Sequence, residues 1–283
     1  MKKIYLLIYL LLYTLNHNLV FSAPVSGIGS FSFDKNKDNY FLSGFQFVVR
    51  ADHQNNKLPT QSKQVLYKDP DSEDDARHYT KSRSSDNCAD TAEFEAGASF
   101  FDNVYIYGKA GFGRFQSELF ILDEIVVGLY QSPFAVKVTD NSLFTYGGGL
   151  SIKIFEKEVK SLFKYLNTHL DFQYRRFSID TGKFGQKDIS YDADFDEIQG
   201  AVVLSGSGEN TRVFFGPRVS SITGNEKLII KKTDFLYEGR LKTSKNIGWV
   251  FGINFFENDK YSISMQKRTG DEEGVSFEAQ IKF

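Results

Sequence analysis

The sequence of 283 residues carries a formal net charge of −2, with 41% hydrophobic and 16% aromatic residues. A chain of this length holds one or two domains or one large barrel, and its near-neutral charge argues against nucleic-acid binding. Its single cysteine, Cys88, excludes an intrachain disulfide. A zinc or nucleophile role for this thiol needs partners that the sequence does not reveal. The 28 Phe and 15 Tyr residues, against 2 Met and 1 Trp, favour strands over helices.

The N-terminus has the features of a Sec-type signal peptide. Lys2 and Lys3 precede an apolar run at 4–15, which is too short to span a bilayer as a helix. Small residues favour cleavage after Ser22, so residues 1–22 are expected to be removed. The exported remainder has no apolar run near 18 residues, and it can therefore cross a membrane only as a closed barrel.

Residues 23–39 are expected to form a periplasmic lead-in, and 40–283 the barrel. Segments that alternate apolar and polar residues recur through this region, as in strands with two different faces. One ambiguous stretch, 117–141, is either a hairpin projecting beyond the membrane or two more strands. The expected strands span 40–50, 91–101, 104–115, 143–155, 162–177, 189–204, 211–223, 246–256, 261–268 and 274–283.

Two of these strands carry a local irregularity. In 189–204 the apolar residues change parity after Phe195, which predicts a β-bulge near Asp196 and Glu197. Pro217 is expected to weaken the strand at 211–223, because proline donates no backbone hydrogen bond. The connections alternate between long polar loops and short turns, and the long loops are expected at 52–90, 116–141 and 224–245.

The C-terminal segment 274–283 alternates most clearly and ends on an aromatic residue. Val275, Phe277, Ala279, Ile281 and Phe283 share one face, opposite Ser276, Glu278, Gln280 and Lys282. Together with the Tyr-Gly-Gly-Gly-Leu-Ser-Ile-Lys-Ile run at 146–154 and the Leu-Asp-Phe-Gln-Tyr-Arg-Arg run at 170–176, this strand resembles the bacterial outer-membrane β-barrel class, including OmpA-like barrels and their ten-stranded relatives.

The resemblance implies an all-β fold, an antiparallel transmembrane β-barrel of about ten strands, within a range of about 8 to 12. It also implies an outer-membrane location and contact with membrane lipids. Insertion would depend on the barrel-assembly machinery, with Phe277, Ile281 and Phe283 as the assembly signal. A monomer without cofactors is expected. The resemblance does not imply one activity.

The polar faces of the strands collect ionisable residues that are expected to line the lumen. A barrel of about eight strands is filled by side chains, whereas wide aqueous channels need about sixteen strands. Ten strands therefore predict a mostly plugged interior of paired charges, with a narrow porin-like channel as the alternative. The expected lining residues are Glu93, Glu95, Lys109, Lys153, His169, Asp171, Arg175, Arg212, Arg218, Glu278 and Lys282.

No catalytic motif emerges from the sequence, so the chain is predicted not to be an enzyme. His169 with Asp171 and Asn167 is the candidate acid/base group of a rim hydrolase. An omptin-like protease needs an Asp-x-His that the chain lacks, and an outer-membrane phospholipase needs Ser where Asp171 stands. Asp192 and Asp194 share a face but have no such partner.

An acidic run in the loop expected at 52–90 is the one weak metal candidate. Its carboxylates are dense enough for Ca²⁺, but the run lacks the spacing and the glycine of an EF-hand. A solvated loop is therefore the preferred interpretation. The candidate ligands are Asp69, Asp71, Glu73 and Asp75. The predicted role is a non-catalytic surface barrel with long external loops.

Overall fold

The computed structural model describes residues 42–58, 60–67, 76–78, 85–101, 103–121, 134–159, 163–180, 189–230, 235–242, 246–255, 257, 260–270 and 273–283. The expected signal peptide at 1–22, the lead-in at 23–39 and the acidic run at 69–75 lie outside these residues. Every regular element within them is a β-strand. In this part of the chain, no helix is long and apolar enough to cross a bilayer.

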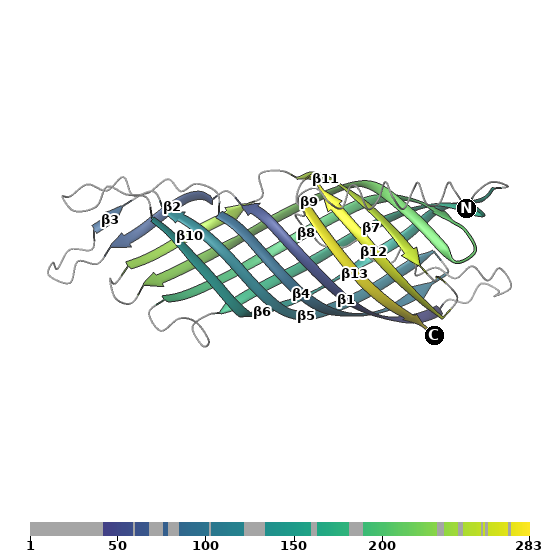
Figure 1. The fold of residues 1–283 in the computed structure, drawn as a ribbon, viewed down its shortest axis with the longest axis horizontal. Helices are drawn as coiled ribbons and strands as arrows, with labels where there is room; N and C mark the ends of the chain where they lie inside the picture. Colours follow the sequence, from purple (N-terminus) through teal and green to yellow (C-terminus); the bar gives the residue numbers. More distant parts are fainter. Residues whose placement is uncertain are drawn as a thin grey trace.

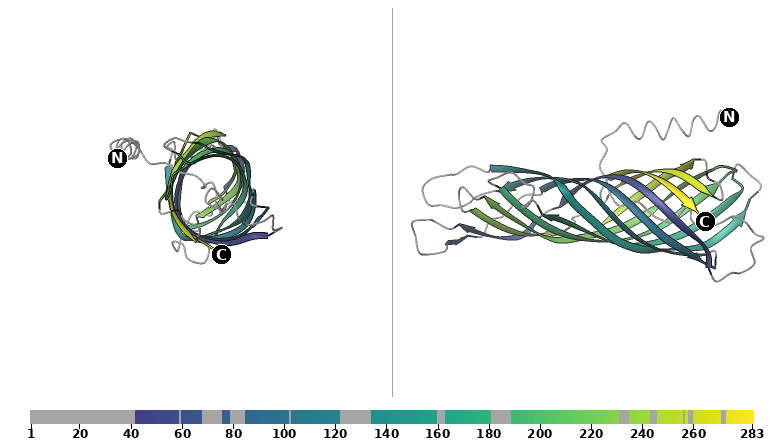
Figure 2. Two further views of the ribbon diagram at one scale, coloured as in Figure 1. Left: turned by 90° about the vertical axis from the view of Figure 1, so that its right-hand side faces the viewer. Right: turned by 90° about the horizontal axis from the view of Figure 1, so that it is seen from below.

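Ten antiparallel strands close into one barrel, as Figures 1 and 2 show. Consecutive strands of the ring pair with each other, and the ring closes where β13 pairs with β1. The expected ten-stranded antiparallel barrel is therefore confirmed. In ring order the strands are β1 (Leu42–Leu58), β4 (Ser85–Phe100), β5 (Val104–Ile121), β6 (Phe134–Glu158), β7 (Tyr165–Asp180), β8 (Ile189–Ser207), β9 (Thr211–Ile230), β11 (Ile247–Phe255), β12 (Tyr261–Thr269) and β13 (Glu273–Lys282).

The wall of the barrel is much taller on one side than on the other. β6 has 25 residues and β9 has 20, whereas β11 and β12 have 9 each. β9 pairs with β11 through its first half and with β10 (Phe235–Lys242) through its second half. β10 also pairs with β2 (Thr60–Tyr67), and β2 pairs with β3 (Ala76–His78), so these three strands continue the sheet beyond the short strands (Figure 1).

The short turns lie at the end of the barrel that holds the C-terminus. They connect β4 to β5, β6 to β7, β8 to β9 and β11 to β12, and in outer-membrane barrels such turns are periplasmic. We call this the periplasmic end. The opposite end holds the tall parts of β1 and β4 to β9 together with β2, β3 and β10, and we call it the extension.

Several expected loops are strands in the structure, so their boundaries in the sequence were wrong. The expected loop at 52–90 contains the end of β1, all of β2 and β3, and the start of β4. The stretch 116–141 holds the end of β5 and the start of β6, in agreement with the projecting-hairpin alternative, and 224–245 holds the end of β9 and all of β10. The outward residues of these segments are polar because they face water rather than lipid. A sequence pattern that requires an apolar outward face therefore assigns these segments to loops.

The predicted bulge in β8 is absent. β7 and β8 keep one register from Tyr165↔Ser207 to Asp180↔Asp192, and the inward parity of Tyr191 continues unbroken through Glu197. The apolar residues of β8 therefore change parity because its inward residues change from apolar, as at Phe195, to polar, as at Glu197. Pro217 stands within β9 without ending it, although the β8–β9 pairing skips its position.

The outward face carries a band of exposed apolar side chains at the level of the short strands. Phe47 is 55% exposed, Phe94 57% and Phe277 54%, which is unfavourable in water and favourable in hydrocarbon. This band marks the level at which the barrel crosses the membrane. Other members are Phe45, Val49, Ile106, Phe112, Phe144, Phe172, Ile198, Phe215, Val219, Phe251 and Ile281.

Above this band the arrangement of polar and apolar residues inverts. In the extension the exposed outward residues are polar, including Lys137, Thr139, Asp194, Thr223 and Glu238. Most of the inward residues are apolar and form one buried cluster, with Asn87, Ser117 and Glu226 as buried polar residues on the same face. The apolar cluster consists of Ala89, Phe115, Val138, Leu143, Phe177, Ile179, Tyr191, Ala193, Phe195, Ile222 and Leu228. The extension is thus built like a water-soluble barrel placed on top of a membrane barrel.

Candidate functional site

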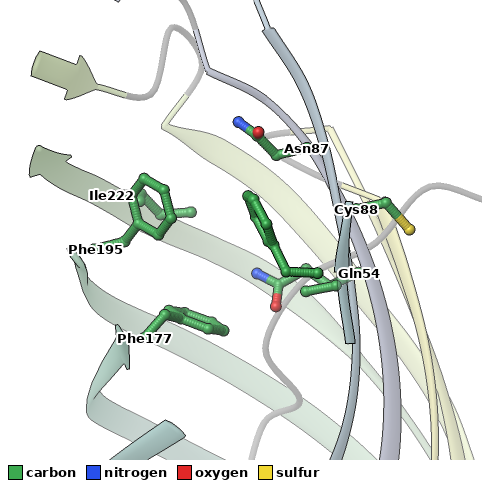
Figure 3. Close-up of a pocket in the computed structure, with 8 residues that line it drawn as sticks. Gln54, Asn87, Cys88, Phe177, Phe195 and Ile222 are labelled. Atoms are coloured by element: carbon green, nitrogen blue, oxygen red, sulfur yellow. The ribbon is translucent and has the colours of Figure 1, made fainter. Parts of the chain in front are cut away.

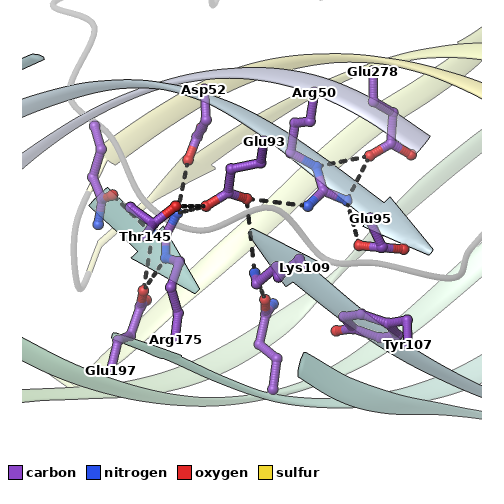
Figure 4. Close-up of polar contacts among 12 residues, drawn as sticks. Arg50, Asp52, Glu93, Glu95, Tyr107, Lys109, Thr145, Arg175, Glu197 and Glu278 are labelled. Carbon is purple, nitrogen blue, oxygen red and sulfur yellow. Dashed lines mark hydrogen bonds and ion pairs between the residues drawn. The ribbon is translucent and has the colours of Figure 1, made fainter. Parts of the chain in front are cut away.

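The interior at the level of the apolar band is filled with paired charges. Because side chains alternate across each strand, the residues between the lipid-facing ones all point into the lumen. There they meet the charged residues of the other strands, as Figure 4 shows. We call this set the charge network. It comprises Arg50, Asp52, Glu93, Glu95, Lys109, Arg175, Glu197, Arg218, Arg268 and Glu278.

Arg175 of β7 joins the two sides of the lumen. Its Nη2 donates to Glu197 Oε2 at 2.9 Å on the neighbouring β8 and to Gln54 Oε1 at 2.8 Å on β1. Its Nη1 donates to Glu93 Oε1 at 3.1 Å and to Asp52 Oδ2 at 3.4 Å. Around the ring, three strands separate β7 from β1 on one side and five on the other, so these contacts cross nearly the full lumen.

Arg50 of β1 organises a second group of carboxylates. Its Nη2 donates to Glu278 at 3.0 Å and to Glu95 at 3.2 Å, and its Nη1 lies 3.5 Å from Glu93. Tyr105 donates a further hydrogen bond to Glu95 at 3.1 Å. The same Glu93 carboxylate therefore connects the Arg50 group to the Arg175 group.

The network is electrically balanced. Its five basic side chains face five carboxylates, and Asp52, for example, contacts both Arg175 and Arg268. Both Asp52 and Arg175 have 0% exposed side chains. Unpaired charges in such surroundings would be very costly, whereas paired and hydrogen-bonded charges are tolerated. The pairing allows the lumen to be polar and closed at the same time.

A second layer closes the lumen directly above the network. Phe177 follows Arg175 on the same inward face, and its ring centroid lies 4.3 Å from the guanidinium carbon in a cation–π contact. The Phe115 ring lies 5.9 Å from Tyr191 and 6.0 Å from Phe195 across the interior. These contacts belong to the apolar cluster of the extension.

A small cavity lies at the boundary between the two layers, among the residues of Figure 3. Its volume is about 30 Å³, enough for one or two water molecules. Gln54 and Asn87 supply its polar side chains, and Phe115, Phe177, Phe195 and Ile222 most of its apolar wall. A space of this size suits water and is too small for a substrate.

The structure distributes the predicted lumen residues over two levels. Glu93, Glu95, Lys109, Arg175, Arg218 and Glu278 belong to the charge network. Lys153, His169, Asp171, Arg212 and Lys282 lie nearer the periplasmic end, where Arg212 pairs with Glu257 at 2.7 Å and Lys153 with Glu156 at 2.9 Å.

The candidate acid/base group lies deep inside the barrel. His169 is 1% exposed and Asp171 is fully buried, and Asp171 accepts hydrogen bonds from Tyr107 at 3.4 Å and Gln173 at 3.3 Å. Asp192 and Asp194 lie on the opposite, outward parity of β8, where Asp194 pairs with Arg176 at 3.5 Å. In the described part of the chain these residues are therefore not assembled into a hydrolase site at the rim.

Sequence reasoning missed four members of the network. Arg50 and Asp52 continue the inward parity of Gln46 and Val48, but the first strand was expected to end at residue 50. Glu197 was missed because a bulge was expected at its position, and Arg268 because it was expected to be the last residue of its strand. Extending the set of every second, inward-facing residue beyond the apolar part of each strand would have identified all four residues.

No protein-family model and no curated protein sequence matches the chain. Among solved structures, it is similar to the outer membrane protease OmpT from Escherichia coli, with 9% identity, a TM-score of 0.43, and coverage of 87% of this chain and 97% of that one. It is also similar to the transport unit of the autotransporter AIDA-I from Escherichia coli, with 8% identity, a TM-score of 0.41 and coverage of 89% and 92%. These similarities carry no activity over to this chain.

Proposed function

We propose that this ten-stranded β-barrel is a bacterial outer-membrane protein without catalytic activity, with a closed lumen, that acts at the cell surface through its extension. The membrane level anchors the protein in lipid. The extension holds β2, β3 and β10 and the ends of the longest strands outside the membrane. Loops carried by a rigid scaffold are the usual place for recognition.

The cross-lumen contacts of Arg175 support the closed lumen most directly. A side chain that bonds Glu197 on its own side and Asp52 and Gln54 on the far side obstructs the passage at that level. The apolar cluster above it adds a mainly apolar layer, in which the described buried carboxylate Glu226 accepts a hydrogen bond from Tyr191 at 3.0 Å, and ions cross such a layer only at high cost. A porin-like channel would need both layers to move aside.

Conductance in planar lipid bilayers tests this proposal. The folded protein should give no stepwise current in concentrated KCl, while a general porin in the same bilayer gives steps and shows that insertion is detected. Insertion of the protein itself is verified by recovering its heat-modifiable form from the bilayer lipid. Reproducible steps from the protein would overturn the closed lumen and support the narrow channel instead.

The absence of catalysis is tested separately. Incubation with a peptide library and with phospholipid vesicles should release no product above a buffer control. Turnover that is lost in the His169→Ala variant would contradict the proposal and would assign that histidine a chemical role. Membrane lipids and the barrel-assembly machinery remain the proposed partners, and the machinery would recognise β13.

A further inference from the structure

Three side chains with metal-binding groups meet on the outward face of β1 and β4. His53 lies directly opposite Asp90 in the β1–β4 pair, and Cys88 precedes Asp90 by two residues and so shares its face. The His53 Nδ1 contacts the Asp90 carboxylate, and the Cys88 Sγ lies 4.0 Å from the same nitrogen. The three possible ligand atoms all lie within 4.8 Å of one another.

We propose that His53, Cys88 and Asp90 form a binding site for a zinc-class divalent cation on the outer surface of the barrel. Ligand bonds to zinc are about 2.3 Å for sulfur and about 2.0–2.2 Å for nitrogen and oxygen. Ligand atoms at tetrahedral angles then lie roughly 3.3–3.7 Å apart. Small side-chain rotations bring the observed atoms to that spacing, without any movement of the strands.

The donor set selects the class of metal. A thiolate and an imidazole are the ligands of zinc and of other borderline or soft cations, whereas Mg²⁺ and Ca²⁺ prefer sites made of oxygen. Three protein ligands leave the fourth tetrahedral position for water or for an external donor. The site differs in chemistry from the acidic run at 69–75, which offers carboxylates without a thiol or an imidazole.

The surroundings leave the site accessible from the external medium. The His53 and Asp90 side chains are 47% and 49% exposed. Two residues closer to the membrane level along each strand, Ala51 lies opposite Ala92 on the same outward face. This pair marks the upper edge of the apolar band. Figure 3 shows the Cys88 sulfur pointing away from Phe177 and from the small cavity, so the thiol faces outward. The site therefore sits where the barrel leaves the membrane.

Thiol labelling is a direct test, because Cys88 is the only cysteine of the chain. The full-length folded protein is stripped with chelator and treated with a maleimide, with and without Zn²⁺. Saturating Zn²⁺ should slow labelling of Cys88 by at least about tenfold, because the thiolate that attacks the maleimide is the same group that binds the metal. The protection should disappear in His53→Ala and Asp90→Asn, and it should persist in Asp194→Asn, an exposed carboxylate of β8.

Cobalt supplies an independent measurement on the same protein. Co²⁺ should produce a thiolate-to-metal charge-transfer band that is absent in Cys88→Ser, with one equivalent bound. Labelling that is unchanged by zinc, together with no charge-transfer band, would overturn the proposal and leave a His53–Asp90 ion pair only. Heat-modifiability confirms that each variant is folded, and the wild-type measurements decide the question if a variant is not.

Discussion

Arg175 and Arg176 are neighbours on β7 whose guanidinium groups lie in opposite environments. Arg175 is fully buried among Asp52, Glu93 and Glu197, whereas Arg176 is 35% exposed and lies 3.5–3.6 Å from Asp194 and Asp196. The pair separates the contribution of a buried charge from that of a surface charge while the strand stays the same.

Removing Arg175 should be far more costly than removing Arg176. Arg175→Ala leaves the buried carboxylates of Asp52, Glu93 and Glu197 with one basic partner fewer, an uncompensated buried charge, and should lower the free energy of unfolding by about 3–5 kcal/mol. Arg176→Ala breaks only exposed ion pairs and should cost roughly 0–1 kcal/mol. Urea unfolding in lipid vesicles measures both values. Equal values for the two variants would mean that Arg175 is not the centre of the network.

At the scale of elements, Gly270 follows the end of β12, where the chain turns toward β13. Gly270 has a φ of +109°, which side chains rarely adopt, and an added Cβ would lie 2.8 Å from Gly248 Cα. The short strands on this side of the barrel depend on that turn to reverse direction.

Gly270→Ala should therefore destabilise the barrel by about 1–3 kcal/mol, the usual cost of a strained backbone. Gly108→Ala is the matched control, because its new Cβ would meet only one atom, at an ordinary distance of 3.9 Å. The urea midpoints of the two variants provide the comparison. If Gly270→Ala unfolded at the wild-type midpoint, the turn would have a different conformation.

The last residue holds the closing strand to the first. The Phe283 amide donates to the Phe45 carbonyl at 2.9 Å, the Phe45 amide donates to the Phe283 carbonyl at 3.1 Å, and the Phe283 ring packs edge-on against Phe47 at 5.9 Å. These contacts give the C-terminal aromatic residue a structural role in addition to the assembly signal that it resembles.

Deletion of Phe283 should sharply lower the yield of heat-modifiable, folded barrel in the outer membrane. Phe283→Trp keeps the backbone bonds and an aromatic ring, and it should assemble nearly as well as the wild type. Gel-shift assays on membrane fractions read out both variants. Normal accumulation of the deletion variant would refute the assembly role.

The sequence predicts the strands well where lipid lies outside. Phe277 and Ile281 in β13, and Phe251 in β11, are apolar residues that alternate with polar or small ones along their strands. This alternation predicts the number of strands and the closed ring. The alternation fails as a guide where water lies on the outside, because the exposed outward residues of the extension are polar and most of its inward residues are apolar. The same inversion explains the false bulge in β8. Predicting that Asp90 lies opposite His53 requires the register between β1 and β4, and alternation of residue types alone does not give that register.

At the scale of the whole molecule, the barrel consists of two levels with opposite polarity. The outward band is apolar at the short strands, and the outward face of the extension is polar. One charged side chain introduced at each level should reveal the boundary between them.

Phe251→Arg places a charge on the lipid-facing side of β11 and should cost about 2–4 kcal/mol. Thr223→Arg makes the same change on the outward face of β9 in the extension, where the residue is exposed to water, and should change stability by less than about 0.5 kcal/mol. Urea unfolding in vesicles compares them. A similar cost at both positions would remove the evidence for two levels.

The pairing of β1 with β13 has a consequence for biogenesis. Gln46 and Gln280 are hydrogen-bonded although 234 residues separate them in the sequence. The cylinder therefore cannot be completed until translocation of the whole polypeptide is finished. Until then β1 presents an unsatisfied edge, which is prone to mispairing with other chains. Synthesis halted before β13 should therefore yield degraded or aggregated product, which pulse-chase labelling of a variant truncated before β13 would measure.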